Sequence, residues 1–168
     1  TKTYRSWPFR SDDDVKTWTR VSTIHPTGNE TTILHLGGKR WLAAARETAM
    51  DLFTSDDDGV TWSAPNRVTQ KNEINGHLAK LKDGRLVLTY GNRIKVGDQL
   101  GVLAKFSYDE GKTWSEPVRI AFTKTGDCGY PSTIQRADGK LVTAWYSGNS
   151  EYHARYHMGV AIWEAPKK

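Results

Sequence analysis

The chain has 168 residues, which is enough for one domain with a substantial core, and its formal net charge is +5. Aromatic residues make up 11% and charged residues 26% of the sequence, and no apolar run approaches the roughly 18 residues of a membrane-spanning helix. We therefore expect a soluble protein that has no transmembrane segment and no membrane partner.

The predicted elements are strands, because the sequence lacks a useful length of helical periodicity and is rich in aromatic residues, which strands accept readily. In chain order, we expect strands at 4–10 and 20–24; at 30–36, 40–46, 50–55 and 66–70; at 77–81, 86–90, 101–107 and 118–122; and at 132–135, 140–146 and 159–163. These groups divide a single domain, 1–168, into units of 1–24, 25–70, 71–122 and 123–168.

One eight-residue segment recurs along the chain. Residues 55–62 read SDDDGVTW and residues 107–114 read SYDEGKTW, and both fit the pattern S-x-D-x-G-x-T-W. Residues 11–18 read SDDDVKTW and depart from it only where Val15 replaces glycine. The copies start at 11, 55 and 107, so their spacings of 44 and 52 residues are close to the repeat of a propeller blade.

A second repeat alternates with these boxes. Residues 34–42, 79–87 and 134–142 align, each with a central pair of turn residues between two apolar stretches. The pairs are Gly37-Gly38, Asp83-Gly84 and Asp138-Gly139. Such pairs tolerate the positive φ of tight hairpins, so each aligned segment predicts a hairpin between two strands.

The boxes are expected to hold turns rather than ligands. Their aspartates can accept hydrogen bonds from backbone N–H groups, and their tryptophans can wedge between sheets. The residues assigned this structural role are Ser55, Asp57, Gly59, Trp62, Ser107, Asp109, Gly111 and Trp114. Calcium is the alternative, but the box is too short to supply six or more oxygen ligands.

The boxes alternating with hairpins resemble the sialidase and neuraminidase superfamily with Asp-box (BNR) repeats. Residues 42–47 (LAAARE) and 129–134 (GYPSTI) also resemble segments common in its bacterial members. The resemblance implies an all-β propeller, with a half blade, two blades and an incomplete blade in this chain. Bacterial members resemble six-bladed propellers with far longer chains, and this chain has too few blades to close such a ring. It is therefore expected to be part of a longer protein or to pair as a homodimer that completes the ring.

In propellers the pocket rim carries the loops between the second and third strands and the crossings between blades. Here the loops between second and third strands are 46–49, 90–100 and 146–158, and the crossings between blades are 25–30, 71–77 and 124–130. Family chemistry implies roles for residues in them: Arg46, Arg93 and Arg155 for a substrate carboxylate; Tyr130 or Tyr146 as nucleophile; Glu47 or Glu73 as its base; Asp127 as proton donor; and His77, His153 and His157 for the sugar.

The expected function is a sialidase-like, exo-acting glycoside hydrolase, or a fragment of one, with a carbohydrate ligand and no cofactor. The alternative is a non-catalytic glycan-binding or structural propeller module. Zinc at His77, His153 and His157 is a weaker hypothesis, because the spacing of the last two suits a helix but they fall in a loop.

The remaining features exclude little. Basic residues are scattered, which argues against nucleic acid as a partner. Cys128 is the only cysteine, so neither an intrachain disulfide nor a cysteine-based metal cluster is expected. Residues 1–10 lack the features of a signal peptide, but the chain starts at Thr1 rather than Met, which leaves a processed leader open and the compartment undetermined.

Overall fold

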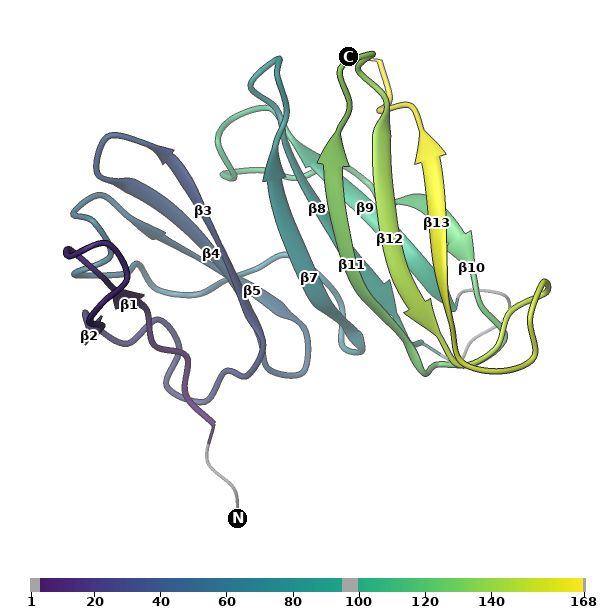
Figure 1. The fold of residues 1–168 in the computed structure, drawn as a ribbon, viewed down its shortest axis with the longest axis horizontal. Coiled ribbons are helices and arrows are strands. Elements are labelled where there is room, and N and C mark those ends of the chain that lie inside the picture. The colour runs from purple at the N-terminus through teal and green to yellow at the C-terminus, as the bar shows by residue number, and fades with distance from the viewer. Residues whose placement is uncertain (1–3, 95–99, 168) are drawn as a thin grey trace.

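The computed structural model of the chain describes residues 4–94 and 100–167. Its regular elements are strands, as Figure 1 shows. They are β1 (Phe9–Arg10), β2 (Thr19–Arg20), β3 (Thr31–Gly37), β4 (Arg40–Arg46), β5 (Met50–Ser55), β6 (Asn66–Arg67), β7 (Glu73–Lys80), β8 (Leu86–Asn92), β9 (Gly101–Ser107), β10 (Val118–Phe122), β11 (Cys128–Gln135), β12 (Leu141–Ser147) and β13 (His157–Trp163). The described part of the chain contains no helix that could span a membrane.

The strands form antiparallel sheets in which chain neighbours are also neighbours in space. The first sheet has the order β3-β4-β5-β6, the second β7-β8-β9-β10 and the third β11-β12-β13, and β1 pairs only with β2. The sheets stack side by side, and the first strand of the second sheet contacts the first strands of both other sheets (Figure 1). The predicted all-β, partial-propeller architecture is therefore confirmed.

Several strand boundaries differ from the prediction. β1 and β2 are two residues long each, and an isolated bridge between Ser6 and His25 continues their pairing. β7 and β11 begin earlier than expected, at Glu73 and Cys128. Both contain a register shift that spans a residue with positive φ, and such a bulge breaks the alternation from which a strand is recognised in sequence.

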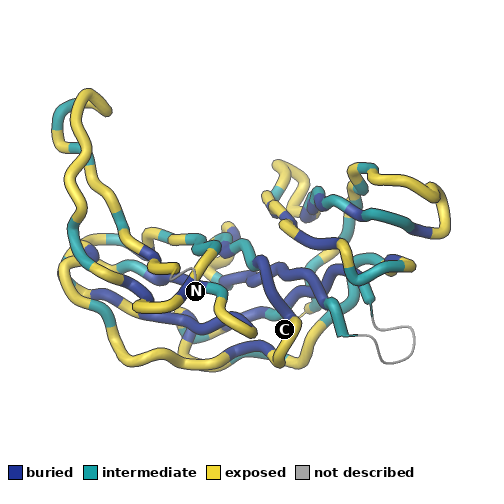
Figure 2. The backbone as a smooth tube through the Cα atoms, turned by 90° about the horizontal axis from the view of Figure 1, so that it is seen from below, coloured by how far each residue is buried: buried dark blue, intermediate teal, exposed yellow. Residues whose placement is uncertain are grey.

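The core lies between the stacked sheets. One cluster, including Leu42, Leu52 and Leu88, fills the space between the first and second sheets. A second, including Phe106 and Leu141, lies between the second and third. Figure 2 shows buried residues concentrated in the strands and exposed residues at the turns, so burial between the sheets holds the stack together.

The Asp boxes close their turns with side-chain hydrogen bonds, as expected. Asp57 accepts from the backbone N–H of Thr61 at 2.9 Å and from its hydroxyl at 2.7 Å, while the Ser55 hydroxyl accepts from the N–H of Gly59 at 2.9 Å. The equivalent bonds to Asp109 lower the pKa of that carboxyl to about 2. In the first box Val15 adopts a φ of 61°, a left-handed conformation that a β-branched residue resists.

Tyr90 of β8 is fully buried, and its hydroxyl has no hydrogen-bond partner within the described residues. Because an unsatisfied buried hydroxyl costs free energy, Tyr90→Phe is expected to raise the free energy of unfolding by about 1 kcal/mol. Chemical denaturation measures this, with the exposed Tyr152→Phe as a control that should change nothing. A less stable Tyr90→Phe variant would mean that the hydroxyl does have a partner.

Candidate functional site

Three residues that occupy one repeat position come together where the sequence predicts the pocket rim. Glu30, Asn75 and Tyr130 each stand four residues before the start of an aligned hairpin segment. Asn75 and Tyr130 are the bulge residues of β7 and β11, with φ values of 60° and 46°. Strained conformations of this kind recur at functional sites. The bulges therefore turn two inner strands so that their side chains join Glu30, which directly precedes β3.

Arg46, the last residue of β4, links two of these positions. Its Nη1 donates to Glu30 Oε1 at 2.9 Å and Oε2 at 2.8 Å, and to Asn75 Oδ1 at 3.0 Å. The hydroxyl of Tyr130 donates a short hydrogen bond to Glu30 Oε1. Glu30 thus bridges an arginine and a phenol that come from different sheets.

A second carboxylate, Asp127, receives two phenols. The Tyr146 hydroxyl donates to Asp127 Oδ1 at 2.5 Å, and the Tyr156 hydroxyl donates a short hydrogen bond to Oδ2. Arg93 donates to the Tyr146 oxygen at 2.9 Å and to the Cys128 carbonyl at 3.0 Å. Tyr146 is consequently held between a cation and an anion.

The two groups form one surface through their rings. The centroids of Tyr130 and Tyr146 lie 5.8 Å apart, and Tyr146 stacks on Tyr156 at 6.4 Å with an interplanar angle of 17°. We call the whole set the tyrosine–carboxylate cluster. It comprises Glu30, Arg46, Asn75, Arg93, Asp127, Tyr130, Tyr146 and Tyr156.

Electrostatics keep the Tyr130 phenol protonated and Glu30 ionised. Partial burial alone would raise the pKa of Glu30, but the hydrogen bond from Tyr130 and the charge of Arg46 outweigh it, and that pKa is lowered. The hydrogen bond to Glu30, followed by burial, raises the pKa of Tyr130. The pair is therefore a neutral phenol hydrogen-bonded to an ionised carboxylate, and in the ligand-free protein both shifts hold the proton on Tyr130.

At the second carboxylate, the hydrogen bonds from Tyr146 and then Tyr156 lower the pKa of Asp127. Burial and the bond to Asp127 raise the pKa of Tyr146 to about 12. Asp127 is thus an ionised hydrogen-bond acceptor at neutral pH. Its role as proton donor, which the resemblance implied, stays a prediction.

The structure brings together five of the predicted site residues: Arg46, Arg93, Asp127, Tyr130 and Tyr146. The predicted partner bases are elsewhere. Glu73 is buried at the start of β7, where its Oε2 accepts from the Gln70 N–H at 2.7 Å. Glu47 accepts from the hydroxyl of Thr27 at 3.1 Å. The carboxylate that accepts from the Tyr130 hydroxyl is Glu30, and neither predicted base contacts that hydroxyl in the described residues.

The remaining candidates belong to other surroundings. Arg155 is exposed in the loop before β13, where its carbonyl accepts from His157 Nδ1 at 2.7 Å, and His153 stands 5.2 Å from the His157 ring. His77 lies within β7, where its Nδ1 accepts from the Thr133 N–H at 3.3 Å and burial lowers its pKa. Residues 95–99 of the predicted rim loop 90–100 fall outside the described residues.

Sequence reasoning missed Glu30, Asn75 and Tyr156. For Glu30 and Asn75 a signal was present, because the aligned hairpin segments place them at the same repeat position as Tyr130. Tyr156 gave no such signal, since it lies in the predicted rim loop 146–158, which is longer than its counterparts 46–49 and 90–100 and does not align with them.

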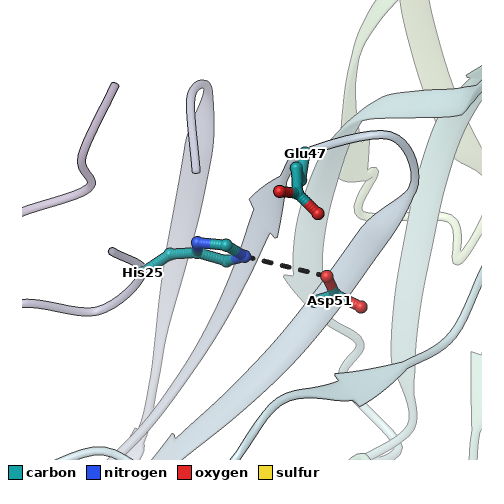
Figure 3. Close-up of side chains that lie close together, drawn as sticks. All are labelled: His25, Glu47 and Asp51. Atoms are coloured by element: carbon teal, nitrogen blue, oxygen red, sulfur yellow. Dashed lines mark ion pairs between the residues drawn. The ribbon is translucent and has the colours of Figure 1, made fainter. Parts of the chain in front are cut away.

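A group of possible metal ligands lies apart from the cluster (Figure 3). One ligand atom each of His25, Glu47 and Asp51 lies within 4.8 Å of the others. However, the Thr27 N–H donates to His25 Nδ1 at 3.0 Å, so the neutral ring carries its proton on Nε2, the nitrogen that faces Asp51. Arg67 already holds both Asp51 oxygens at 2.9 Å. The group is therefore an ion-pair network that does not suit a metal.

Residues 1–143 match the family described as BNR repeat-like domain, which agrees with the resemblance inferred from the boxes. No curated protein sequence matches the chain.

Solved structures similar to the chain include a protein of unknown function from Dyadobacter fermentans DSM 18053, with a TM-score of 0.79, 22% identity and coverage of 94% of this chain and 45% of that one. An α-L-arabinanase from Penicillium chrysogenum complexed with arabinobiose has a TM-score of 0.65, 20% identity and coverage of 95% and 54%. A mutant of the NanB sialidase from Streptococcus pneumoniae has a TM-score of 0.69, 15% identity and coverage of 98% and 28%. The chain thus has the fold of propeller glycosidases and spans about half the length, or less, of these structures.

Proposed function

Because the chain belongs to the BNR repeat-like domain family, we propose that it is a sialidase-like glycoside hydrolase, or the part of one that carries the tyrosine–carboxylate cluster, acting on the terminal sugar of a glycan. The observation that carries this proposal is the hydrogen bond from Tyr130 to Glu30, with Arg46 on the other side of the carboxylate. A phenol beside a carboxylate is the pairing that an activated tyrosine nucleophile requires.

In the proposed reaction, the Tyr130 oxygen bonds to the anomeric carbon while the bond from that carbon to the leaving oxygen breaks. The phenol proton passes to Glu30, and the leaving group departs as its anion, which takes a proton from solvent. Water then attacks the anomeric carbon of the glycosyl–tyrosine intermediate and loses one proton to solvent, while Glu30 returns its proton to the Tyr130 oxygen as the bond to the sugar breaks. A neutral nucleophile suits an anionic sugar, which would repel a carboxylate in the same role. Asp127 accepts a hydrogen bond from a sugar hydroxyl, which replaces the hydrogen bond from Tyr146 or Tyr156.

Two of the three arginines predicted to bind a substrate carboxylate support the proposal. Arg46 and Arg93 are both anchored in the cluster, and both lie close enough to Tyr130 for their charges to act on its pKa. Arg155 is not bound into it. Since three converging arginines are the predicted grip on a carboxylate, acidic and neutral sugars both have to be tested.

A second function, glycan binding without catalysis, is favoured by the aromatic surface. Tyr130 is 49% and Tyr156 70% exposed, and both rings adjoin Tyr146. Exposed tyrosine rings beside hydrogen-bonding groups offer an apolar face and polar edges, which is the combination that binds a sugar.

Hydrolysis of aryl glycosides distinguishes the two functions. Aryl leaving groups depart without protonation, so an aryl sialoside and an aryl α-L-arabinofuranoside test the nucleophile even where a proton donor is missing. Release of the aryl alcohol from at least one substrate is expected. Sugar binding in calorimetry without release would favour the binding module, and absence of both would refute the two functions together.

A further inference from the structure

Asp127 is held in place independently of the two phenols that bind its carboxylate. Its N–H donates to the Thr125 hydroxyl at 2.9 Å, and its carbonyl accepts from the Gly148 N–H at 2.8 Å. Because the backbone of Asp127 makes both bonds, the carboxylate keeps its position when a phenol leaves it. Asp127 is therefore a fixed acceptor whose hydrogen-bond donors can be exchanged.

The two donors differ in how firmly they are held. Tyr146 belongs to β12, and its oxygen also accepts from Arg93 at 2.9 Å. Tyr156 lies in the loop 148–156, and within the described residues its hydroxyl bonds to Asp127 alone. Release of Tyr156 from Asp127 thus breaks one hydrogen bond, whereas release of Tyr146 would also disturb its contact with Arg93.

The loop that carries Tyr156 has hydrogen bonds of its own. The Ser150 N–H donates to the His153 carbonyl at 2.9 Å, and the Arg155 N–H donates to His153 Nδ1 at 3.1 Å. Neither bond involves the Tyr156 side chain. Rotation of that side chain can therefore free Asp127 while the loop stays folded.

A phenol and a sugar offer Asp127 the same group, a hydroxyl that donates to an ionised oxygen. We propose that in the ligand-free protein the Tyr156 hydroxyl occupies the place on Asp127 Oδ2 that a sugar hydroxyl takes in the complex. Tyr156 is then a specificity-determining residue that competes with the ligand. This inference rests on the proposed function, because it takes the tyrosine–carboxylate cluster as the sugar site, and it applies to hydrolysis and to binding alone.

The competition determines how strictly the site selects its ligand. A sugar with the matching hydroxyl exchanges one donor on Asp127 for another, and such an exchange is close to neutral in free energy. A deoxy sugar that lacks this hydroxyl leaves Tyr156 on Asp127, so the carboxylate keeps its partner. Tyr156 therefore lowers the affinity for the matching sugar and makes the site tolerant of sugars without that hydroxyl.

Calorimetric titration tests the competition with sialic acid and methyl α-L-arabinofuranoside as probes, followed by the monodeoxy forms of whichever sugar binds. Tyr156→Phe keeps the ring and removes the competing hydroxyl, so it is expected to bind the parent sugar about 5-fold more tightly than the wild type does. It should also discriminate against one monodeoxy form by a larger factor, because that sugar then covers Asp127 without supplying a donor.

Two further variants serve as comparisons. Tyr152→Phe is the matched control, since Tyr152 lies in the same loop, is 92% exposed and stands outside the cluster, and it should bind like the wild type. Tyr146→Phe should not bind more tightly, because it also removes the partner of Arg93.

The outcomes separate this inference from the proposed function. A wild type that binds a sugar, with Tyr156→Phe binding it equally or more weakly, would overturn the inference and leave the proposed function standing. Tighter binding by Tyr156→Phe without hydrolysis of any aryl glycoside would support the inference and refute only the catalytic role. A wild type that binds neither sugar would overturn the inference and the proposed function together.

Discussion

Replacing Tyr130 with phenylalanine is expected to lower kcat/KM for an aryl glycoside by about 10³-fold or more, because it removes the proposed nucleophile and leaves the ring in place. The loss should fall on kcat, since the ring still contributes to binding. Steady-state kinetics measure it, and Tyr152→Phe, an exposed tyrosine outside the cluster, is the matched control. A Tyr130→Phe variant with wild-type kcat would refute the nucleophile role while leaving the rest of the cluster open to binding.

Glu30→Gln tests the role of Glu30 as general base independently of Tyr130, the proposed nucleophile. Loss of a general base is expected to cost about 10²–10⁴-fold in kcat/KM. Because the pKa of Glu30 is lowered from 4.5, the carboxylate persists through neutral pH, and wild-type activity should fall only as the pH drops through that lowered pKa. The residual activity of Glu30→Gln should lack this acidic limb. An unchanged pH profile would contradict the assignment of Glu30.

Gly91→Ala is expected to destabilise the fold and disturb the cluster together. A Cβ atom at Gly91 would lie 2.9 Å from Gly129 Cα and 3.1 Å from the Cys128 carbonyl oxygen. Both neighbours are backbone atoms of β11, so strands of the second and third sheets must separate. Overpacking of this kind costs about 1–3 kcal/mol, and a displacement near 1 Å at reacting groups can lower activity about 100-fold.

The matched control for this substitution is Gly126→Ala. A Cβ atom there would meet its nearest neighbours at 3.7–3.8 Å, which is ordinary contact, although the residue lies beside Asp127. Thermal unfolding and kinetics of the two variants should therefore differ, with only Gly91→Ala losing stability and activity. Equal melting temperatures would show that the strands separate without cost.

Much of the architecture was predictable because it is repeated. The boxes and the turn pairs of the hairpins mark where strands end, and because each occurs three times, the sequence predicts which strands belong to the same sheet. The early starts of β7 and β11 were not predictable, because a bulge inserts a residue that breaks the two-residue alternation.

The site was predictable only in part. Arg46, Arg93 and Tyr146 end or follow second strands, so topology alone placed them on one rim. The pairing of Tyr130 with Glu30 joins the third sheet to the first across 100 residues of sequence. Such a contact depends on how far each sheet rotates about the axis, which local pattern does not contain.

The shared repeat position of Glu30, Asn75 and Tyr130 carries an engineering consequence. These side chains lie near the ends of inner strands, whereas the apolar side chains that pack the sheets against one another lie along the faces of the strands. An acid, an amide and a phenol already stand at this one position. Substitutions at Glu30, whose backbone does not have a positive φ, should therefore leave the packing of the sheets in place and alter ligand preference, whereas the positive φ of Asn75 and Tyr130 restricts the residues that those two positions accept.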